Sequence, residues 1–251
     1  MDATTQNIIL EMKDVRVVFG RRAALRDISL FVRKQEILSI IGPNGAGKTT
    51  LFDVICGQVR PNDGIIRFDE RDITHWPPHR ICHAGIARTF QIARPFPEMS
   101  VLQNICIGMW FGGKRRYESI TGQAEAEKLL ELVQLSKKRD MAAGELTLSE
   151  QRRLEIARAL ATSPRFLLLD EAAAGLSPHG IKEMAELIRK LRQQGLTLLL
   201  TDHFLTLTGK VSDRLVALDQ GEIIMAGKPA EVLHSDEVIS AYLGERQKEN
   251  L

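Results

Sequence analysis

Nine consecutive residues of this chain have the types and the spacing of a phosphate-binding loop. Residues 42–50 read Gly-Pro-Asn-Gly-Ala-Gly-Lys-Thr-Thr, which satisfies the pattern G-x-x-x-x-G-K-[ST]. The apolar run Ile37–Ile41 precedes the loop and a helical pattern follows it. Its glycines permit a tight turn with positive φ, so that successive N–H groups point inward at the positive end of the helix. Lys48 is then expected to reach the β- and γ-phosphates of a nucleoside triphosphate, and Thr49 to offer its hydroxyl to Mg²⁺.

A second group of candidate residues follows another apolar strand, nearer the carboxyl end of the chain. Phe166–Leu169 are apolar and lead directly into Asp170 and Glu171. Ligands in open α/β sheets bind at the carboxyl ends of strands, so Asp170 is expected to support a Mg²⁺ shell and Glu171 to polarise the attacking water. His203 follows a further apolar run and is expected to contact the γ-phosphate. Buried strands that end in Asp-Glu are common, and the upstream phosphate-binding loop is what makes this pair a catalytic candidate.

The segments that must position these groups have mainly strand patterns in the first ninety residues and again near the end of the chain. Short pieces with alternating apolar residues predict an antiparallel layer near a sheet edge: Ile8–Met12, Val15–Phe19 and Ile28–Val32. Continuous apolar runs predict parallel strands that are buried on both faces: Ile37–Ile41, Phe166–Leu169, Leu196–Leu200 and Leu215–Leu218. Shorter strands are expected at Ile65–Phe68, after the turn Pro61–Gly64, and at Ile86–Phe90.

Helical patterns fill the middle of the chain and return after the Asp-Glu pair. Ser100–Gly108 and Gln123–Val133 have helical apolar spacing, and an amphipathic helix is expected with Ser177 as its N-cap and Gly195 as its C-cap glycine. We therefore predict one α/β domain over residues 1–251, with a mostly parallel core sheet and an antiparallel N-terminal layer. Its core is expected at residues 1–91 and 161–251, with a helical subdomain inserted at about 92–160.

Composition limits the classes of protein to which the chain can belong. It has 251 residues, of which 44% are hydrophobic and 26% charged, as in a soluble globular protein. A net charge of +2 provides no field that favours nucleic acid. The three cysteines are widely spaced, which suits a reducing compartment and suggests neither a metal cluster nor a disulfide framework. No secretory signal or membrane-spanning run is recognisable, so a cytoplasmic location is expected unless a partner holds the chain elsewhere.

Taken together, these segments resemble the ATP-binding subunits of ABC transporters over nearly the whole chain. In that family Gly42–Thr50 corresponds to the P-loop, Phe166–Glu171 to the Walker B strand and Ala174–Pro178 to the D-loop. The resemblance makes Phe19 the aromatic residue that stacks on adenine, although the residue alone reads equally well as part of the core. The ATP-binding residues that it implies are Phe19, Gly42, Pro43, Asn44, Gly45, Ala46, Gly47, Lys48, Thr49 and Thr50.

The same resemblance assigns the chemistry to a small set of residues. Gln91 matches the family's Q-loop glutamine, which links the Mg²⁺ site to the transmembrane partner, and His203 matches the switch histidine. The implied metal-binding residues are Thr49, Gln91 and Asp170. The implied catalytic residues are Lys48, Gln91, Glu171 and His203.

Within the family, the chain is most similar to the ATPases of branched-chain amino acid importers. The similarity lies in residues 83–91, in residues 96–104, in the glycine-containing loop that follows, and in the ending Ala241-Tyr242-Leu243-Gly244-Glu245. The lipopolysaccharide-export ATPase is the next most similar group, since it has a comparable Tyr-Leu-Gly-Glu tail.

The family's signature segment departs from its usual sequence in this chain. The pattern Leu-Ser-Gly-Gly-Gln appears as Leu146-Thr147-Leu148-Ser149-Glu150, and a matching helix sequence follows it. In the family this segment starts a helix that faces the γ-phosphate bound by the other subunit. Thr147 and Glu150 form a capping box in sequence, so the helix start and its dipole are expected to be retained. Ser149 adds a β-carbon where the backbone must approach phosphate closely, and Ala172 replaces a usual proline with little expected effect.

The resemblance implies an energising subunit of a membrane importer, with ATP and Mg²⁺ as ligands. The expected partners are a second ATPase subunit, in a hetero- or homodimer, two transmembrane permease subunits and, indirectly, a solute-binding protein. The expected location is the cytoplasmic face of the inner membrane, and no nucleic acid partner is expected. A sibling transport ATPase, a soluble ATPase of the iron–sulfur assembly type and a regulator that does not hydrolyse ATP are the alternatives. The intact Lys48, Asp170, Glu171 and His203 weigh against the regulator.

Overall fold

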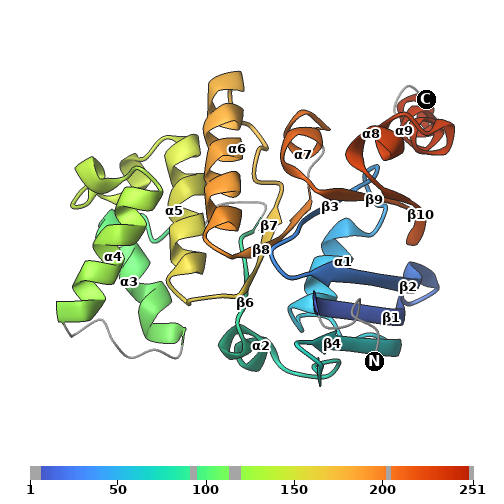
Figure 1. Cartoon of the computed structure of the whole chain (residues 1–251), viewed down its shortest axis with the longest axis horizontal. Helices are drawn as coiled ribbons and strands as arrows, with labels where there is room; N and C mark the ends of the chain where they lie inside the picture. Colours follow the sequence, from blue (N-terminus) through green and yellow to red (C-terminus); the bar gives the residue numbers. More distant parts are fainter. Residues whose placement is uncertain (1–6, 91–94, 113–119, 202–204, 249–251) are drawn as a thin grey trace.

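The strand that leads into the phosphate-binding loop lies inside a six-stranded sheet. We analysed a computed structural model, which describes residues 7–90, 95–112, 120–201 and 205–248 (Figure 1). The strand order in this sheet is β10-β9-β3-β8-β7-β6, and every neighbouring pair is parallel except β9 and β10. The strands are β3 (Ile37–Ile41), β6 (Ile86–Arg88), β7 (Phe166–Asp170), β8 (Thr197–Thr201), β9 (Arg214–Asp219) and β10 (Glu222–Gly227).

A second sheet is antiparallel and is formed largely by the amino-terminal part of the chain. Its order is β2-β1-β4-β5, from β1 (Ile8–Phe19), β2 (Arg22–Arg33), β4 (Asp63–Phe68) and β5 (Arg71–Asp72). Between the sheets lies α1 (Lys48–Ile55), and one apolar cluster joins Leu10 and Ile28 of the second sheet, Phe52 of α1, and Leu38 and Phe166 of the first. The loop that ends at α1 is therefore held by both sheets.

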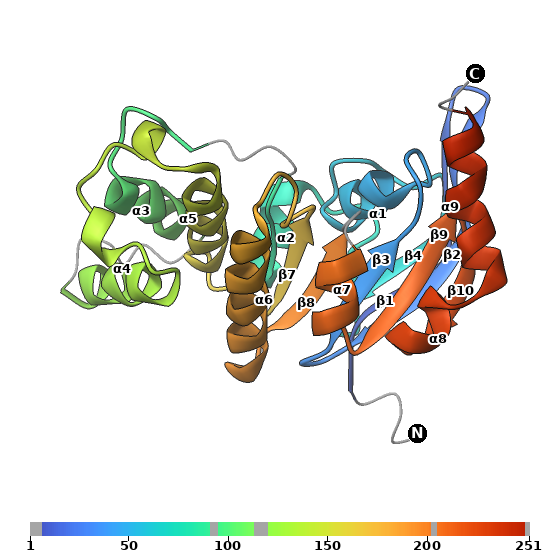
Figure 2. The ribbon, with the colours of Figure 1, turned by 90° about the horizontal axis from the view of Figure 1, so that it is seen from above.

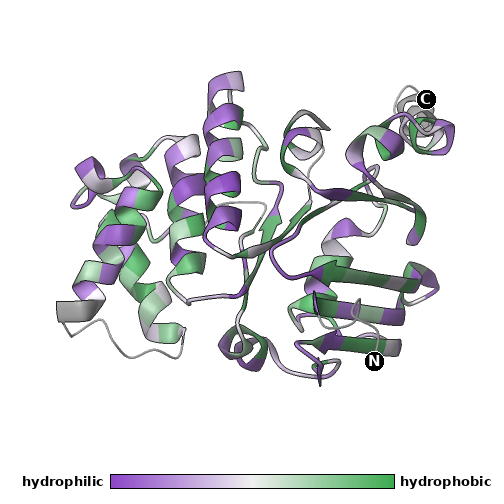
Figure 3. Cartoon of the chain, in the orientation of Figure 1, coloured by the Kyte–Doolittle hydropathy of each residue, from purple (hydrophilic) through white to green (hydrophobic). Residues whose placement is uncertain are grey.

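Helices cover the other face of the six-stranded sheet. The helices α6 (Pro178–Gln193) and α7 (Leu205–Val211) lie on this face, opposite α1 (Figure 2). Apolar side chains of α6 pack on those of β7 and β8, which explains why these strands carry continuous apolar runs. Figure 3 shows that β7 and β8 are largely apolar, whereas α6 carries both apolar and polar residues.

Three helices that lie between β6 and β7 in the chain pack together at one end of the molecule (Figure 1). They are α3 (Val101–Phe111), α4 (Ile120–Leu132) and α5 (Leu148–Leu160), with the 3₁₀ helices η2 (Ser136–Lys138) and η3 (Ala143–Glu145) before α5. The short α2 (Pro78–Ala84) precedes β6, while α8 (Pro229–Leu233) and α9 (Asp236–Lys248) pack against β9 and β10. The predicted inserted helices are thus present, and the subdomain boundary at about 92–160 stays a prediction.

The predicted strands are confirmed with changes in their bounds, and β2 begins at Arg22, six residues before the predicted start at Ile28. Two separately predicted pieces form the single strand β1, whose pairing shifts near Asp14, a residue with φ of 51°. The predicted strand at Ile86–Phe90 ends earlier, at Arg88, and α3 extends through Phe111, three residues beyond its predicted end. Ser177 caps α6 as predicted, and Gly195, with φ of 93°, follows its last turn. In the part of the chain that the structure describes, no helix has the length and apolarity needed to cross a bilayer.

Candidate functional site

The phosphate-binding loop joins the carboxyl end of β3 to the first residue of α1. Gly47 is the N-cap of α1 with φ of 109°, and the helix then begins at Lys48. A β-carbon on Gly42 would lie 2.0 Å from the carbonyl oxygen of Leu218, and one on Gly47 would lie 2.7 Å from that of Ala24. These two glycines are therefore required by the close approach of β9 and β2 as well as by backbone conformation. The Gly42 N–H also donates to the Tyr242 hydroxyl of α9 at 2.8 Å.

Lys48 holds the loop in its turn. Its Nζ donates to the carbonyl oxygens of Gly42, at 2.5 Å, and of Pro43, at 2.7 Å, and the residue is only 6% exposed. The ammonium group thus lies under the loop, where an anion cradled by the loop N–H groups would meet it. This position agrees with the role expected from the motif.

A pocket of about 500 Å³ brings together three of the predicted segments. It contains Phe19 from the end of β1, six residues of the loop and α1, and Glu171 from the end of β7. Its lining residues are Phe19, Arg22, Ala24, Asn44, Gly45, Gly47, Lys48, Thr49, Thr50 and Glu171. Phe19 is 53% exposed, which argues against the alternative reading of this residue as part of the core. Arg22 and Ala24 were not predicted, because nothing in the sequence indicates that the start of β2 folds over the loop.

Asp170 and Glu171 lie where the parallel strands end. The Asp170 carboxylate accepts one hydrogen bond from Thr201 Oγ1 at 2.7 Å and another from Arg88 Nη2 at 2.6 Å. Glu171 has φ of 48°, an unfavourable value for a residue with a side chain, and its N–H donates to the Thr201 carbonyl at 2.9 Å. This left-handed turn takes the chain out of the strand direction at Glu171, whose side chain reaches the pocket. Strained backbone of this kind is frequent at functional sites.

Arg88 ties this carboxylate to α1. Its Nη1 donates to Asp53 Oδ1 at 2.5 Å, so the guanidinium bridges Asp53 and Asp170. Burial opposes the charge of Arg88, but the hydrogen bonds to the two carboxylates outweigh it and raise the pKa of the guanidinium. Burial also disfavours the charged form of the neighbouring Cys56 thiol. It raises the pKa of this thiol to about 12, so the cysteine stays protonated.

The signature segment begins α5 and forms the predicted capping box. Thr147 is the N-cap, its hydroxyl accepts from the Glu150 N–H at 3.4 Å, and its own N–H donates to Glu150 Oε2 at 3.0 Å. Lys138 of η2 pairs with the Glu150 carboxylate at 2.7 Å. The hydrogen bonds from Lys138 and from the Thr147 backbone outweigh the effect of burial and lower the pKa of Glu150. Glu150 is therefore negatively charged, and the ammonium group of Lys138 balances this charge.

Within the described residues, the lining of the 500 Å³ pocket includes none of Thr147–Glu150. The segment lies instead beside the predicted D-loop, since a β-carbon on Gly175 would lie 2.9 Å from Leu148 Cδ2. Leu148 is 45% exposed at the start of α5. The signature and the D-loop thus adjoin each other at a surface outside the chain's own pocket.

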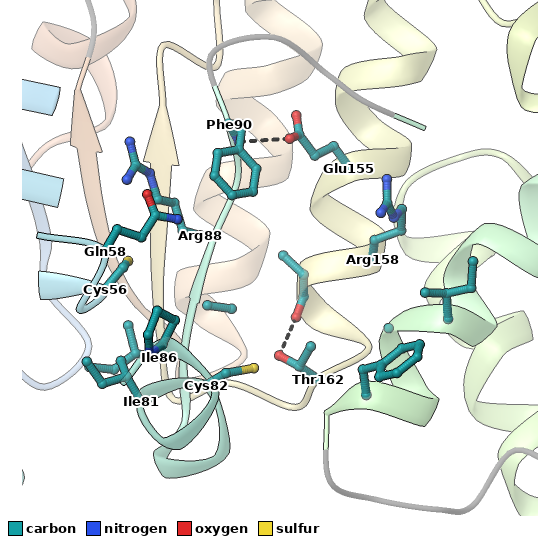
Figure 4. Close-up of a pocket in the computed structure, with 16 residues that line it drawn as sticks. Cys56, Gln58, Ile81, Cys82, Ile86, Arg88, Phe90, Glu155, Arg158 and Thr162 are labelled. Carbon is teal, nitrogen blue, oxygen red and sulfur yellow. Dashed lines mark hydrogen bonds between the residues drawn. The ribbon is translucent and has the colours of Figure 1, made fainter. Parts of the chain in front are cut away.

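The residue before Gln91 is held by α5. Glu155 accepts from the Phe90 N–H at 2.7 Å (Figure 4). Arg152 Nη1 donates to the Phe90 carbonyl at 3.0 Å. Burial raises the pKa of Glu155 to about 7 despite its backbone hydrogen bond to Phe90 and the nearby Arg152 and Arg158. Two predicted site residues, Gln91 and His203, lie outside the residues that the structure describes.

A second pocket, of about 380 Å³, opens between the core and the inserted helices (Figure 4). Residues from the end of α1, from α2, β6, α3 and α5 line it. Much of its lining is apolar, including Ile81, Ile107 and Phe111, and the Phe111 side chain is 75% exposed. The charged part of the lining comes from Arg88, Glu155 and Arg158.

Comparison with known proteins identifies the family. The family model described as ABC transporter matches residues 25–174, which is more than half of the chain. The chain belongs to the ABC transporter family. The match contains the phosphate-binding loop, the signature segment and the Asp170–Glu171 pair, so the resemblance inferred from the sequence is confirmed.

Individual members of the ABC transporter family match almost from end to end. The high-affinity branched-chain amino acid transport ATP-binding protein BraF of Pseudomonas aeruginosa is 38% identical over 250 residues, covering 94% of this chain and 98% of BraF. The LivG protein of Escherichia coli, which has the same description, is 37% identical over 251 residues, covering 94% and 98%. The lipopolysaccharide export system ATP-binding protein LptB of Acidithiobacillus ferridurans is 37% identical over 238 residues, covering 95% and 98%.

The fold is confirmed by a solved ABC transporter structure. The crystal structure of an ATP-binding cassette in its ADP conformation superposes with a TM-score of 0.88 at 33% identity. The superposition covers 94% of this chain and 99% of that cassette. The predicted α/β fold, with its antiparallel amino-terminal sheet and parallel core sheet, is therefore that of an ABC ATPase.

Proposed function

We propose that this chain is the ATP-hydrolysing, energy-coupling subunit of an ABC importer. Its solute would be a branched-chain amino acid or a related small polar or amphipathic molecule, because BraF and LivG are described as transport proteins for such amino acids. The observation that carries the proposal is the pocket in which Phe19, the phosphate-binding loop and Glu171 meet. This pocket has an aromatic face, an anion cradle and a carboxylate, which are the groups that binding and hydrolysis of ATP require.

In this proposal ATP lies along residues 42–50 with its adenine on the Phe19 ring. The exposed ring offers a face for stacking, and the loop N–H groups and Lys48 take the phosphates. Thr49, Gln91 and Asp170 hold Mg²⁺ directly or through water, since hydroxyl, amide and carboxylate oxygens are the ligands that this ion prefers. The ion supplies charge neutralisation on the phosphates when it is bound.

Glu171 and His203 complete the proposed catalytic group. Glu171 accepts a proton from the attacking water, and the left-handed backbone at this residue directs its side chain into the pocket. His203 follows β8, the neighbour of β7, and in the proposal it contacts the γ-phosphate. Lys48 neutralises charge that develops on the phosphates as the bond breaks.

The signature segment acts on the ATP of a second ATPase subunit. Two subunits close head to tail on ATP, so that the start of α5 in one subunit faces the γ-phosphate held by the other. Hydrolysis lets the pair reopen, and the nucleotide thereby biases a two-state motion. Thr147 and Leu148 are exposed, and the segment lies outside the chain's own pocket, which supports this arrangement. The pair is a heterodimer or a homodimer.

Substitutions in the signature segment test this arrangement. Thr147→Ala should remove the cap, cost about 0.5–2 kcal/mol of local helix stability, and weaken ATP-driven dimerisation. Ser149→Gly should be neutral or raise turnover, because it removes a β-carbon beside the partner's phosphate. ATP affinity of the isolated chain should not change in either variant. Loss of transport in Ser149→Gly, with folding and ATP binding intact, would show that the serine has a specific role and that this account of the segment is wrong.

The pair between Lys138 and Glu150 gives a second test of the same arrangement. Lys138→Met should weaken ATP-driven dimerisation, because an uncompensated carboxylate then faces the partner's phosphate. Glu150→Gln should rescue the Lys138→Met variant, since it removes that charge, whereas Lys137→Met on the same 3₁₀ helix should have no effect. Sedimentation of the chain with ATP measures all three variants beside the wild type. A double variant as weak as Lys138→Met alone would contradict the placement of Glu150.

The permease subunits are the proposed partners at the second pocket. Its apolar lining between the core and the inserted helices suits a short helical segment of a membrane protein, and Arg88 and Glu155 in its wall adjoin the strand that leads to Gln91. A partner held there could bias the position of Gln91 through Phe90. Two permease subunits would keep the chain on the cytoplasmic face of the membrane, with a solute-binding protein as an indirect partner.

Recovery of the chain with its partners tests the proposed function. A tagged chain purified from detergent-solubilised membranes should bring down two polytopic membrane proteins and a second ATPase. A lipopolysaccharide exporter is the second candidate, because LptB is 37% identical to this chain, and its membrane subunits would then be recovered instead. Recovery without any membrane subunit would favour a soluble ATPase of the iron–sulfur assembly type and reject the importer.

A further inference from the structure

Asp170 is held at both of its carboxylate oxygens by donors that have no role so far in the proposed nucleotide site. Thr201 Oγ1 bonds Oδ1 at 2.7 Å and Arg88 Nη2 bonds Oδ2 at 2.6 Å. The Asp170 side chain is 4% exposed and that of Arg88 is 6% exposed. Neither donor can be replaced by bulk water, so the direction of the carboxylate depends on both of them.

Arg88 is itself braced on three sides. Its second arm reaches Asp53, which lies five positions after Lys48 on α1. Its guanidinium lies over the Phe52 ring, at 5.4 Å from the centroid, and over the Phe90 ring, at 5.5 Å. The planar fork of an arginine fits two carboxylates at once, whereas a lysine has a single point of charge. Arg88 therefore links α1 to the end of β7 through two hydrogen bonds in a fixed geometry.

We propose that Arg88, braced by Asp53, is a positioning residue that sets the orientation of the Asp170 carboxylate toward the metal–nucleotide complex. The inference rests on the proposed function, in which Asp170 supports Mg²⁺. Residues that orient a metal-supporting group through hydrogen bonds commonly change metal affinity by about 10–100-fold when they are altered. Through the bonds described above Arg88 touches neither the loop nor any residue that lines the ATP pocket, and its hydrogen bond to Asp170 is its direct contact with a proposed metal-supporting residue.

Charge alone predicts the opposite change in Mg²⁺ affinity when Arg88 is replaced, and this difference makes the inference testable. Asp53, Arg88 and Asp170 together carry a formal charge of −1, and removal of Arg88 makes the cluster more negative. If charge alone mattered, Arg88→Met would bind Mg²⁺ more tightly and Arg88→Lys would resemble the wild type. If orientation matters, both variants bind Mg²⁺ more weakly, because neither has the two separated, coplanar donors that fix the direction of the Asp170 carboxylate.

The experiment is a Mg²⁺ titration of nucleotide binding by the isolated chain, followed with a fluorescent ATP analogue. Arg88→Lys and Arg88→Met should raise the Mg²⁺ concentration at half-maximal effect by about 10–100-fold, and Asp53→Asn should raise it by less. Affinity for the analogue in EDTA should stay unchanged, since the phosphate-binding loop is intact. Arg214→Lys is the matched control, because Arg214 also pairs with a buried carboxylate, Glu36 at 2.8 Å, away from the pocket. It should leave the Mg²⁺ response unchanged.

Three results would overturn the inference. They are a shift below about 2-fold in Arg88→Lys, tighter Mg²⁺ binding in Arg88→Met, and an equal shift in the Arg214→Lys control. If the Arg88 variants do not fold, Asp53→Asn decides the question, because Asp53 is a quarter exposed and its substitution weakens the brace by removing its charge; an unchanged Mg²⁺ response in that variant would then overturn the inference. A wild-type chain whose nucleotide binding does not respond to Mg²⁺ at all would instead reject the proposed function.

Discussion

Glu171→Gln is expected to leave ATP binding intact and to slow hydrolysis by about 10²–10⁴-fold, the usual contribution of a positioned general base. The substitution keeps the shape of a side chain that is only 9% exposed and removes its ability to accept the proton of the attacking water. Single-turnover hydrolysis by the assembled ATPase pair, measured with saturating Mg²⁺ and ATP, gives the rate. Binding of the analogue to the same variant should match the wild type.

Glu11→Gln provides the control for this prediction. Glu11 is an exposed carboxylate of β1 that pairs with Arg67 at 3.4 Å, and its substitution should not change turnover. An unchanged rate in Glu171→Gln would mean that another group orients the water. The catalytic assignment at the end of β7 would then be wrong.

Lys48→Ala should remove most ATP binding. A charge-assisted hydrogen bond to phosphate contributes about 1.5–3 kcal/mol, so its loss should lower the affinity by roughly 10–100-fold. The two bonds from Nζ to the Gly42 and Pro43 carbonyls are lost in the same variant, and the loop should loosen as well. Equilibrium binding of the ATP analogue measures the effect. An affinity within a few-fold of the wild type would contradict the assignment of the loop.

The control for Lys48→Ala is a lysine that takes no part in the pocket, in the turn between β2 and β3. Lys34 pairs with Asp69 at 3.6 Å and is half-exposed, and Lys34→Ala should bind the analogue like the wild type. A thermal melt of both variants separates a loss of phosphate contacts from a loss of folded protein.

Structural features that depend on residues close together in the sequence were predicted correctly. The bounds of β3 agree with the apolar run that predicted it, the capping box at Thr147 forms with the expected donors and acceptors, and Ser177 caps α6. Each of these depends on residues within a few positions of one another. The strand β10 and the helices α7, α8 and α9 were not predicted. The elements β10, α7 and α8 are short, and the apolar residues of α8, α9 and β10 are explained only by their packing against β9 and its neighbours.

Features that depend on distant residues were missed. In the sequence Arg88 is a single basic residue within a predicted strand. Its partners Asp53 and Asp170 are 35 and 82 positions away, so no local pattern indicates them. The same holds for Glu155, which bonds Phe90 across 65 positions and lies on the apolar face of α5. A charged residue at a position that the helical or strand pattern marks as buried was the available signal, since such a charge needs a partner.

The central claim is that ATP hydrolysis by this chain drives solute across a membrane. The direct test is uptake of radiolabelled leucine, with related amino acids and amides as further solutes, by proteoliposomes that contain the co-purified complex and its solute-binding protein. The account predicts uptake that requires ATP and Mg²⁺ and that is abolished when this chain carries Glu171→Gln. Uptake that persists in the Glu171→Gln complex, or ATP hydrolysis without movement of any of these solutes, would contradict it.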